Sequence, residues 1–243
     1  MTMAERARRD GQLAYLLHTY PYRETSLVAE IYTRDTGRVA LIARGARRPR
    51  SVLRGVLMAF QPLLLAWSGK SELKMLHKAE WQGGYVPLRG LSLICGFYLN
   101  ELLLKLLPRE DAHEQLFEAY AAALAQLPDA RDHAAVLRRF ERVLLRELGY
   151  GLVLDREVAG GNPIEPAARY CYVPERGPLP AHEGGEQSGV ELTGQTLIDM
   201  AVDHYADPRT VQQSKALMRA LINHCLGRQT LHTRQLLRDL QQL

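Results

Sequence analysis

The residues best suited to chemistry in this sequence are arginines, and they gather in one short stretch. Residues 37–54 carry six arginines and no acidic residue. They are Arg38, Arg44, Arg47, Arg48, Arg50 and Arg54. The first half of the stretch alternates like a strand and the second half is an Arg/Pro/Ser loop. A strand that runs into clustered guanidiniums predicts contact with an extended anion, first of all a phosphate backbone. A solvated basic surface is the plainer alternative.

Three lysines extend the basic character beyond the arginines. They are Lys70, Lys74 and Lys78. Lys74 and Lys78 have the same parity in a predicted strand, so we expect both on one face. All three are predicted to add to the same anion-binding surface.

Aromatic residues near the basic stretch could stack nucleic-acid bases, at about 1–3 kcal/mol per base. The candidates are Tyr20, Tyr22, Phe60, Trp67, Trp81 and Tyr85. Most such residues belong to a core, so only one or two are expected to stack. Tyr22 is selected because it lies in a turn beside Arg23, whereas Trp67 ends an apolar strand.

Known catalytic and metal-binding patterns are missing from the sequence. It has no G-x-S-x-G, no P-loop, no G-x-G-x-x-G and no H-E-x-x-H, and its acids do not cluster as a two-metal nuclease needs. The Cys/His grouping of His224, Cys225 and His232 lacks the four ligands and the spacing of a zinc site. We therefore expect no catalytic residue, no cofactor and no metal.

Charge and apolar content are distributed unevenly along the 243 residues. Up to residue 80, 14 lysines and arginines face 7 acids, whereas the remainder has 17 against 20. This places the expected polyanion contact in the first part.

Three scattered cysteines indicate a reducing compartment. The N-terminus lacks an apolar core of a signal peptide, and the most apolar window, 91–107, is too polar to span a membrane. A cytoplasmic protein without membrane contact is predicted.

The arginines must be positioned by short strands at the start of the chain. Alternating patterns and turn residues predict five strands, at 12–20, 26–33, 37–45, 60–68 and 72–79. Residues 51–59 have room for one or two helical turns. Five strands with a short insertion after the third favour a small closed barrel of the oligonucleotide-binding (OB) type. We assign this domain to residues 1–82.

After Pro87, the spacing of apolar residues changes to the period of helices. Helices are predicted at 91–107, 110–127, 133–148, 196–205, 208–226 and 233–242. Residues 155–189 form an irregular excursion with a strand at 169–173, and another strand is expected near 190–192. The second domain thus covers residues 83–243, and the whole chain is of the α+β class.

Several segments of the chain resemble the RecO family of bacterial recombination mediators. They include ETSL (24–27), GRVALIARGARRPRS (37–51), FQPLLL (60–65), YLNELLLKLLPRED (98–111), LRRFERVLLRELGYG (137–151) and TRQLLRDL near the end. They follow the order of the family over nearly the whole length. The resemblance implies an OB barrel, a helical domain and a role without catalysis.

The family is implied to act on DNA during repair, recombination and the SOS response to damage. Its members bind single- and double-stranded DNA, anneal single strands and, with RecR, help load RecA onto strands coated by single-stranded-DNA-binding protein (SSB). This implies a cytoplasmic, nucleoid-associated protein. Some members have a four-cysteine zinc site in the segment matching 155–185, where this chain has only Cys171. An OB-domain nuclease and a general RNA-binding module stay open as alternatives.

The implied partner SSB has an acidic tail that ends in an apolar residue with a free carboxylate, which calls for an apolar pocket with a basic rim. The helix predicted at 133–148 offers both. The residues selected for this pocket are Arg138, Arg142, Leu137, Phe140 and Leu144. We expect the pocket between this helix and the helix at 91–107, with Arg138 on the carboxylate. An ordinary amphipathic helix is the plainer alternative.

Overall fold

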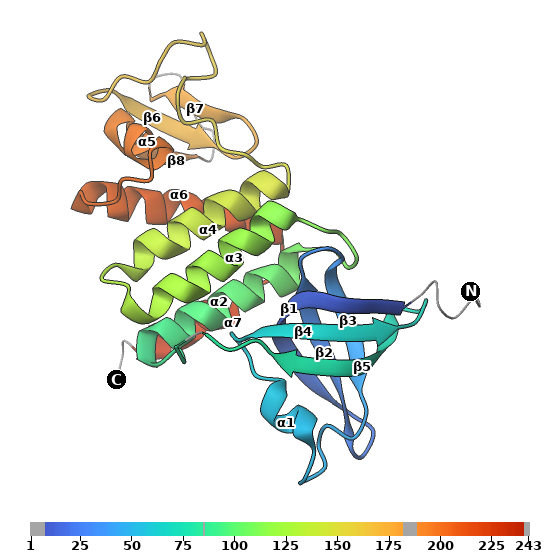
Figure 1. Ribbon diagram of the computed structural model, residues 1–243. Helices are drawn as coiled ribbons and strands as arrows, with labels where there is room; N and C mark the ends of the chain where they lie inside the picture. Colours follow the sequence, from blue (N-terminus) through green and yellow to red (C-terminus); the bar gives the residue numbers. More distant parts are fainter. Residues whose placement is uncertain (1–7, 85, 182–188, 241–243) are drawn as a thin grey trace. The chain divides into compact units, whose positions relative to one another are not determined.

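The computed structural model describes residues 8–84, 86–181 and 189–240, and its first part is a barrel (Figure 1). Five strands form it: β1 (Arg8–Tyr22), β2 (Ser26–Thr33), β3 (Gly37–Ala43), β4 (Pro62–Ser68) and β5 (Leu73–Trp81). They close in the order β1-β2-β3-β5-β4, with β4 paired back to β1 and β3 parallel to β5. The short helix α1 (Val52–Val56) follows β3. The OB-type barrel expected from the sequence is confirmed.

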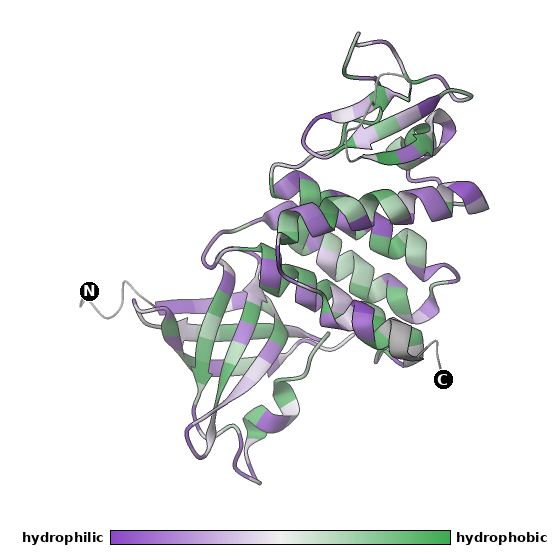
Figure 2. Cartoon of the chain, turned by 180° about the vertical axis from the view of Figure 1, so that it is seen from behind, coloured by the Kyte–Doolittle hydropathy of each residue, from purple (hydrophilic) through white to green (hydrophobic). Residues whose placement is uncertain are grey.

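Alternation along the strands builds the core of the barrel. Ala29 and Ile31 of β2 face inward together with Leu41 of β3 and Leu63 of β4, and none of these four side chains is exposed. Trp67 is also buried in this core, as the sequence predicted. Figure 2 shows hydrophobic residues along much of the barrel strands, with hydrophilic residues interspersed.

The turn between β2 and β3 depends on a glycine. Gly37 has a φ of +71°, and a Cβ there would lie 1.9 Å from the carbonyl oxygen of Asp111. Thr33 Oγ1 donates a hydrogen bond of 2.9 Å to the Gly37 carbonyl. Glycine is therefore required both by the backbone angle and by the close approach of the backbone at Asp111.

Contacts between residues group the described chain into two compact units. The first contains the barrel, α2 (Gly90–Leu106), α3 (Glu114–Gln126), the 3₁₀ turn Leu127–Asp129 and α7 (His232–Leu240). Asn100 of α2 ties the helices to the barrel: its Nδ2 donates to the Leu17 carbonyl at 2.9 Å, and its Oδ1 accepts from the Tyr120 hydroxyl at 2.5 Å. The predicted domain boundary near residue 82 stays a prediction.

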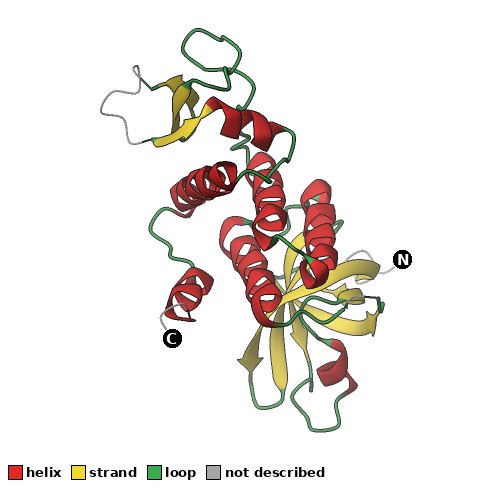
Figure 3. Ribbon diagram, turned by 90° about the vertical axis from the view of Figure 1, so that its left-hand side faces the viewer, coloured by secondary structure: helices red, strands yellow, loops and turns green. Residues whose placement is uncertain are grey.

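The second unit, within residues 130–230, has its own core. It consists of α4 (His133–Glu147), β6 (Arg169–Val173), β7 (Gly177–Pro180), β8 (Val190–Thr193), α5 (Gly194–Ala201) and α6 (Pro208–Leu226). The three strands form a small sheet in the order β7-β6-β8. Leu145, Leu197, Met200 and Leu217 are fully buried at the centre of this unit. Figure 3 separates these strands and helices by colour.

Most predicted elements agree with the observed ones to within one or two residues, and two helices show the largest differences at their ends. The strand at 26–33 and the helix at 208–226 have the predicted bounds. The helix predicted from residue 110 starts at Glu114, because Glu110 N donates to the Arg38 carbonyl instead of starting a helix. The helix predicted at 196–205 covers Gly194–Ala201, with Thr193 as its N-cap. The last two residues of the helix predicted at 233–242 lie outside the described residues.

The helices of the described chain do not have the length and apolar character that crossing a membrane requires.

Candidate nucleic-acid interface

The outer face of the barrel carries a row of partly exposed apolar side chains. Tyr20 of β1 pairs with Val28 of β2, Val28 with Ile42 of β3, and Ile42 with Met75 of β5. Directly paired residues point to the same side of a sheet, so these four form one row. Tyr20 is 48% exposed at the end of the row, while the other three are half-buried.

A hollow with a volume of ≈ 570 Å³ lies beside this row. We call it the barrel hollow. It is lined by Tyr22, Arg23, Glu24, Thr25, Ser26, Ile42, Arg44, Gly45, Arg48 and Met75. Three arginines and one acid thus surround an apolar floor, which is the composition expected for binding bases together with phosphates.

The segment after β3, which includes α1, carries five of the predicted arginines, and two of them, Arg44 and Arg48, line the hollow. Arg44, Arg47, Arg48, Arg50 and Arg54 are all exposed. Successive turns order the loop, with Arg48 N bonded to the Gly45 carbonyl and Ser51 N to the Arg48 carbonyl, each at 3.0 Å. The loop is also held to the β1–β2 turn, because Arg47 N donates to the Thr25 carbonyl at 2.9 Å. These five guanidiniums therefore stand on a defined backbone.

Arg38 lies differently from the other five predicted arginines. Its side chain is only 16% exposed, and its Nη1 lies 3.4 Å from Oε2 of Glu30. Arg109 pairs with the other oxygen of the same carboxylate. Burial lowers the pKa of Arg38, against the opposing effect of Glu30. This guanidinium is thus engaged inside the fold.

The predicted shared face of Lys74 and Lys78 is not formed. The register of β5 against β4 shifts between Leu76 and Lys78, and this irregularity reverses the face. Lys74 is 7% exposed and pairs with Glu110, whereas the side chain of Lys78 is 64% exposed and lies 2.8 Å from Glu80. Lys70 is exposed in the turn before β5.

The exposed aromatic of the interface is Tyr20, which the sequence did not single out. Tyr22 is half-buried, with the Arg23 guanidinium 5.3 Å from the centre of its ring. Phe60 is buried, and Trp81 is 53% exposed at the end of β5. Tyr85 lies outside the described residues. The register of β1 shifts between Leu16 and His18, so Tyr20 faces outward although it shares parity with the core residue Leu16.

Comparison with known proteins identifies the family. The model described as "Recombination protein O N terminal" matches residues 11–85, and "Recombination protein O C terminal" matches residues 89–235. The DNA repair protein RecO of Nitrosospira multiformis is 55% identical over 98% of this chain and 99% of its own length. That of Aromatoleum aromaticum is 56% identical over 99% of this chain and 100% of its own length.

The chain belongs to the RecO family. It is thereby a protein of DNA repair and recombination. Both family models meet between β5 and α2, so the barrel hollow lies in the part matched by the N-terminal model.

Arg138 and Arg142 on helix α4 of this RecO-family chain pair with carboxylates of the second unit. Arg138 is 8% exposed and donates to the fully buried Glu141 at 2.8 Å. The Nε atom of Arg138 is buried without a hydrogen-bond partner among the described residues. Arg142 donates to Asp203 at 2.5 Å. Phe140 and Leu144 are buried and Leu137 is half-buried.

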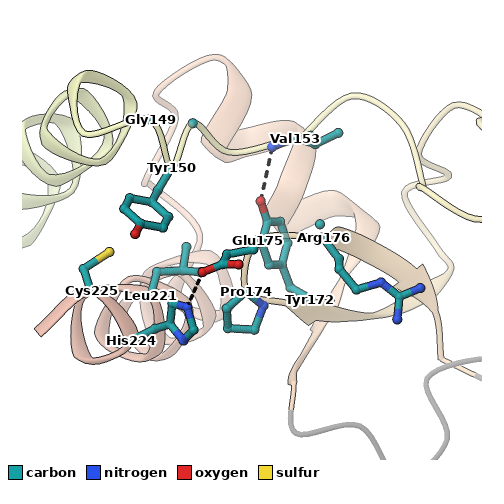
Figure 4. A pocket seen from close by; sticks show the side chains of 12 residues that line it. Gly149, Tyr150, Val153, Tyr172, Pro174, Glu175, Arg176, Leu221, His224 and Cys225 are labelled. Carbon is teal, nitrogen blue, oxygen red and sulfur yellow. Dashed lines mark hydrogen bonds and ion pairs between the residues drawn. The ribbon is translucent and has the colours of Figure 1, made fainter. Parts of the chain in front are cut away.

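A hollow of ≈ 400 Å³ in the second unit contains two of the three residues of the Cys/His grouping (Figure 4). His224 faces Glu175, with 2.7 Å between Nε2 and Oε1, and Tyr150 and Cys225 lie beside them. Burial raises the pKa of the Cys225 thiol, which disfavours the thiolate that binds metals. Within the described residues, no three His, Cys, Asp or Glu side chains are placed to hold a metal ion.

A carboxylate organises the segment in which some relatives are implied to hold zinc. Glu157 is 4% exposed and accepts hydrogen bonds from the backbone N–H groups of Ala159, Gly160 and Asn162, at 2.6–3.1 Å. The bonds from Gly160 and Asn162 lower the pKa of this carboxyl. Cys171 is buried in β6.

Proposed function

We propose that this chain binds single-stranded DNA across the barrel hollow and its arginine loop, without sequence preference. The observation that carries the proposal is the set of exposed arginines around an apolar floor, in a protein of a DNA repair family. Arg44 and Arg48 would neutralise phosphates at the rim. Tyr20, 48% exposed at the end of the apolar row, would stack a base.

The proposed role is to hold and anneal strands rather than to cleave them. A nuclease that uses metal ions needs several carboxylates close to its substrate. Glu24 is the one acid among the ten residues that line the barrel hollow. An RNA-binding module would share the arginines, and competition between RNA and DNA of equal length separates the two.

A salt titration tests the barrel hollow. If about four phosphates are neutralised, the log–log slope of affinity for single-stranded DNA against salt is about −3. The variant Arg44→Glu/Arg47→Glu is expected to lose at least tenfold in affinity and to flatten this slope. Arg89→Glu/Arg131→Glu, an equal change of charge at two other exposed arginines, is the control. Unchanged affinity in the first variant would contradict the proposal.

The finer role proposed is that of a recombination mediator. With RecR, the chain would load RecA onto strands coated by SSB, at the nucleoid in the cytoplasm, and it would bind double-stranded DNA as well. Membership of the RecO family supports this, together with the proposed DNA surface on the barrel.

For the acidic tail of SSB we propose α4 as the docking helix. Arg138 has an unbonded Nε, and the half-buried Leu137 of the same helix offers apolar surface next to it in the sequence, whereas Phe140 and Leu144 are buried. A charge-assisted hydrogen bond to the tail carboxylate contributes about 1.5–3 kcal/mol.

Fluorescence anisotropy with a labelled tail peptide measures this. Arg138→Ala is expected to lower the affinity for the tail peptide by about tenfold or more, while the affinity for naked single-stranded DNA stays within about twofold. Arg139→Ala removes an exposed arginine of the same helix and serves as the control. Loss of both ligands in Arg138→Ala would mean that the variant has lost more than a tail contact.

A further inference from the structure

We propose that the exposed face of α6, in the second unit, is another binding surface for a nucleic-acid backbone, separate from the barrel hollow. The residues that carry the proposal are Gln212, Lys215 and Arg219, with Ala216 and Ala220 beside them. We call this set the α6 face. It goes beyond the proposed function, and rests on it only in taking the same class of ligand.

Charge is segregated sharply within the second unit. Residues 130–207 contain 13 acids against 8 lysines and arginines, whereas residues 208–230 contain four cations and no acid. The four cations are Arg209, Lys215, Arg219 and Arg228, and all are exposed. This is the same pattern, cations without acids, that marks the arginine stretch of the barrel.

The geometry of α6 gathers two of these cations on one side. Lys215 and Arg219 are separated by one helical turn, about 6 Å along the axis. Leu217 and Leu221 on the other side are buried in the core, so the orientation of the helix is fixed. The small side chains of Ala216 and Ala220 leave a shallow hollow of ≈ 390 Å³ beside the cations. An extended backbone can therefore approach the helix closely.

The cations of the α6 face are free, in contrast to several others in the unit. Arg138, Arg142 and Arg156 each pair with a carboxylate within 2.8 Å. The side chains of Lys215 and Arg219 make no ion pair or hydrogen bond to any residue that the structure describes. Two like charges at positions i and i+4 destabilise a helix by a few tenths of a kcal/mol. A bound anion removes that repulsion, which a merely solvated face does not.

A nucleic-acid backbone fits this face better than an acidic peptide does. The lining is narrow, runs along the helix and has no large apolar side chain to anchor a peptide residue. Lys215, Arg219 and the exposed amide of Gln212 instead offer donors to phosphate and sugar oxygens. Together with the barrel hollow, the α6 face would allow one chain to hold two strands.

The experiment uses the full chain and two non-complementary oligothymidylates, one with a donor and the other with an acceptor fluorophore. We expect energy transfer between the strands with the native chain, at one chain per pair of strands by mass photometry. Lys215→Glu/Arg219→Glu is expected to reduce that transfer to background, while affinity for the first strand stays within about twofold. The control with the same change of charge is again Arg89→Glu/Arg131→Glu, which keeps the transfer.

The outcomes separate the two proposals. Energy transfer that persists in Lys215→Glu/Arg219→Glu overturns the proposed α6 face. The proposal is also overturned if polyglutamate abolishes the transfer at a lower concentration than unlabelled oligothymidylate does, because the face then binds an acidic partner. Lys215→Gln/Arg219→Gln, milder at the surface, should give an intermediate loss. If Arg44→Glu/Arg47→Glu leaves first-strand affinity unchanged, the barrel proposal fails, and loss of transfer in the α6 variant still supports the α6 face.

Discussion

Glu30 of β2 forms ion pairs with two arginines. It is 3% exposed, and its two oxygens pair with Arg38 and with Arg109, which lies 79 positions further along the chain. A buried carboxylate between two guanidiniums connects β2, β3 and the segment before α3. Arg38 therefore supports the surface on which the exposed arginines stand, and its own charge is largely compensated.

Removing the charge of Glu30 takes the carboxylate partner from Arg38 in a partly buried place and leaves Arg109 with the exposed Glu72, 3.8 Å away. Glu30→Gln is expected to lower the free energy of unfolding by about 3 kcal/mol, the usual effect of breaking one side of a buried pair. Glu80→Gln is the control, because Glu80 pairs with Lys78 in solvent. Denaturant unfolding followed by circular dichroism measures both. A change below about 1 kcal/mol for Glu30→Gln would mean that water replaces the carboxylate.

At the scale of elements, patterns local in sequence were predictable and long-range pairs were not. The alternation in β2 and the helical period of α6 gave their bounds correctly. The irregularities in β1 and β5 reverse the faces of Tyr20 and Lys78, and no residue type in those strands announces them. Lys74 was assigned to an exposed surface because its partner Glu110 is 36 positions away.

Helix α7 is attached through one carboxylate of α2. Glu101 accepts hydrogen bonds from His232 N at 2.8 Å, Thr233 N at 2.9 Å and Thr233 Oγ1 at 2.7 Å, and pairs with Lys105 at 3.0 Å. Burial alone would raise the pKa of Glu101, but these bonds outweigh it and lower the pKa to about 2. The carboxylate thus occupies the N-terminus of α7, where a negative charge is favourable.

This depressed pKa gives the attachment of α7 a pH dependence. The stabilisation is complete above the unfolded pKa of about 4.3 and is lost as the pH falls toward 2, a difference of about 3 kcal/mol. Hydrogen exchange at the amides of His232 and Thr233 should therefore lose protection between about pH 4.5 and 2. Glu101→Gln should show weak protection that no longer changes across this range. Equal pH profiles for the two proteins would show that another group holds α7.

At the scale of the whole molecule, the chain has two cores made of different residues. Leu41 and Leu63 belong to the core of the barrel, and Leu197 and Leu217 to that of the second unit. All four are fully buried. A change inside one core leaves the contacts of the other core as they are. The proposed barrel hollow should therefore keep its shape when the second unit is weakened.

Leu217→Ala tests this separation. It opens a cavity in the second unit and is expected to lower stability there by about 2–5 kcal/mol. Hydrogen exchange should speed up in α5 and α6, while β2, β3 and the affinity for a first DNA strand stay within about twofold. Leu41→Ala, the matched change in the barrel, should speed up hydrogen exchange in β2 and β3 but not in α5 and α6. It should also lower the affinity for a first DNA strand. If Leu217→Ala lowers the free energy of opening of the barrel amides by the same amount, the two units unfold as one. A variant on the α6 face could then also weaken DNA binding at the barrel, so its affinity for a first strand has to be measured alongside the energy transfer.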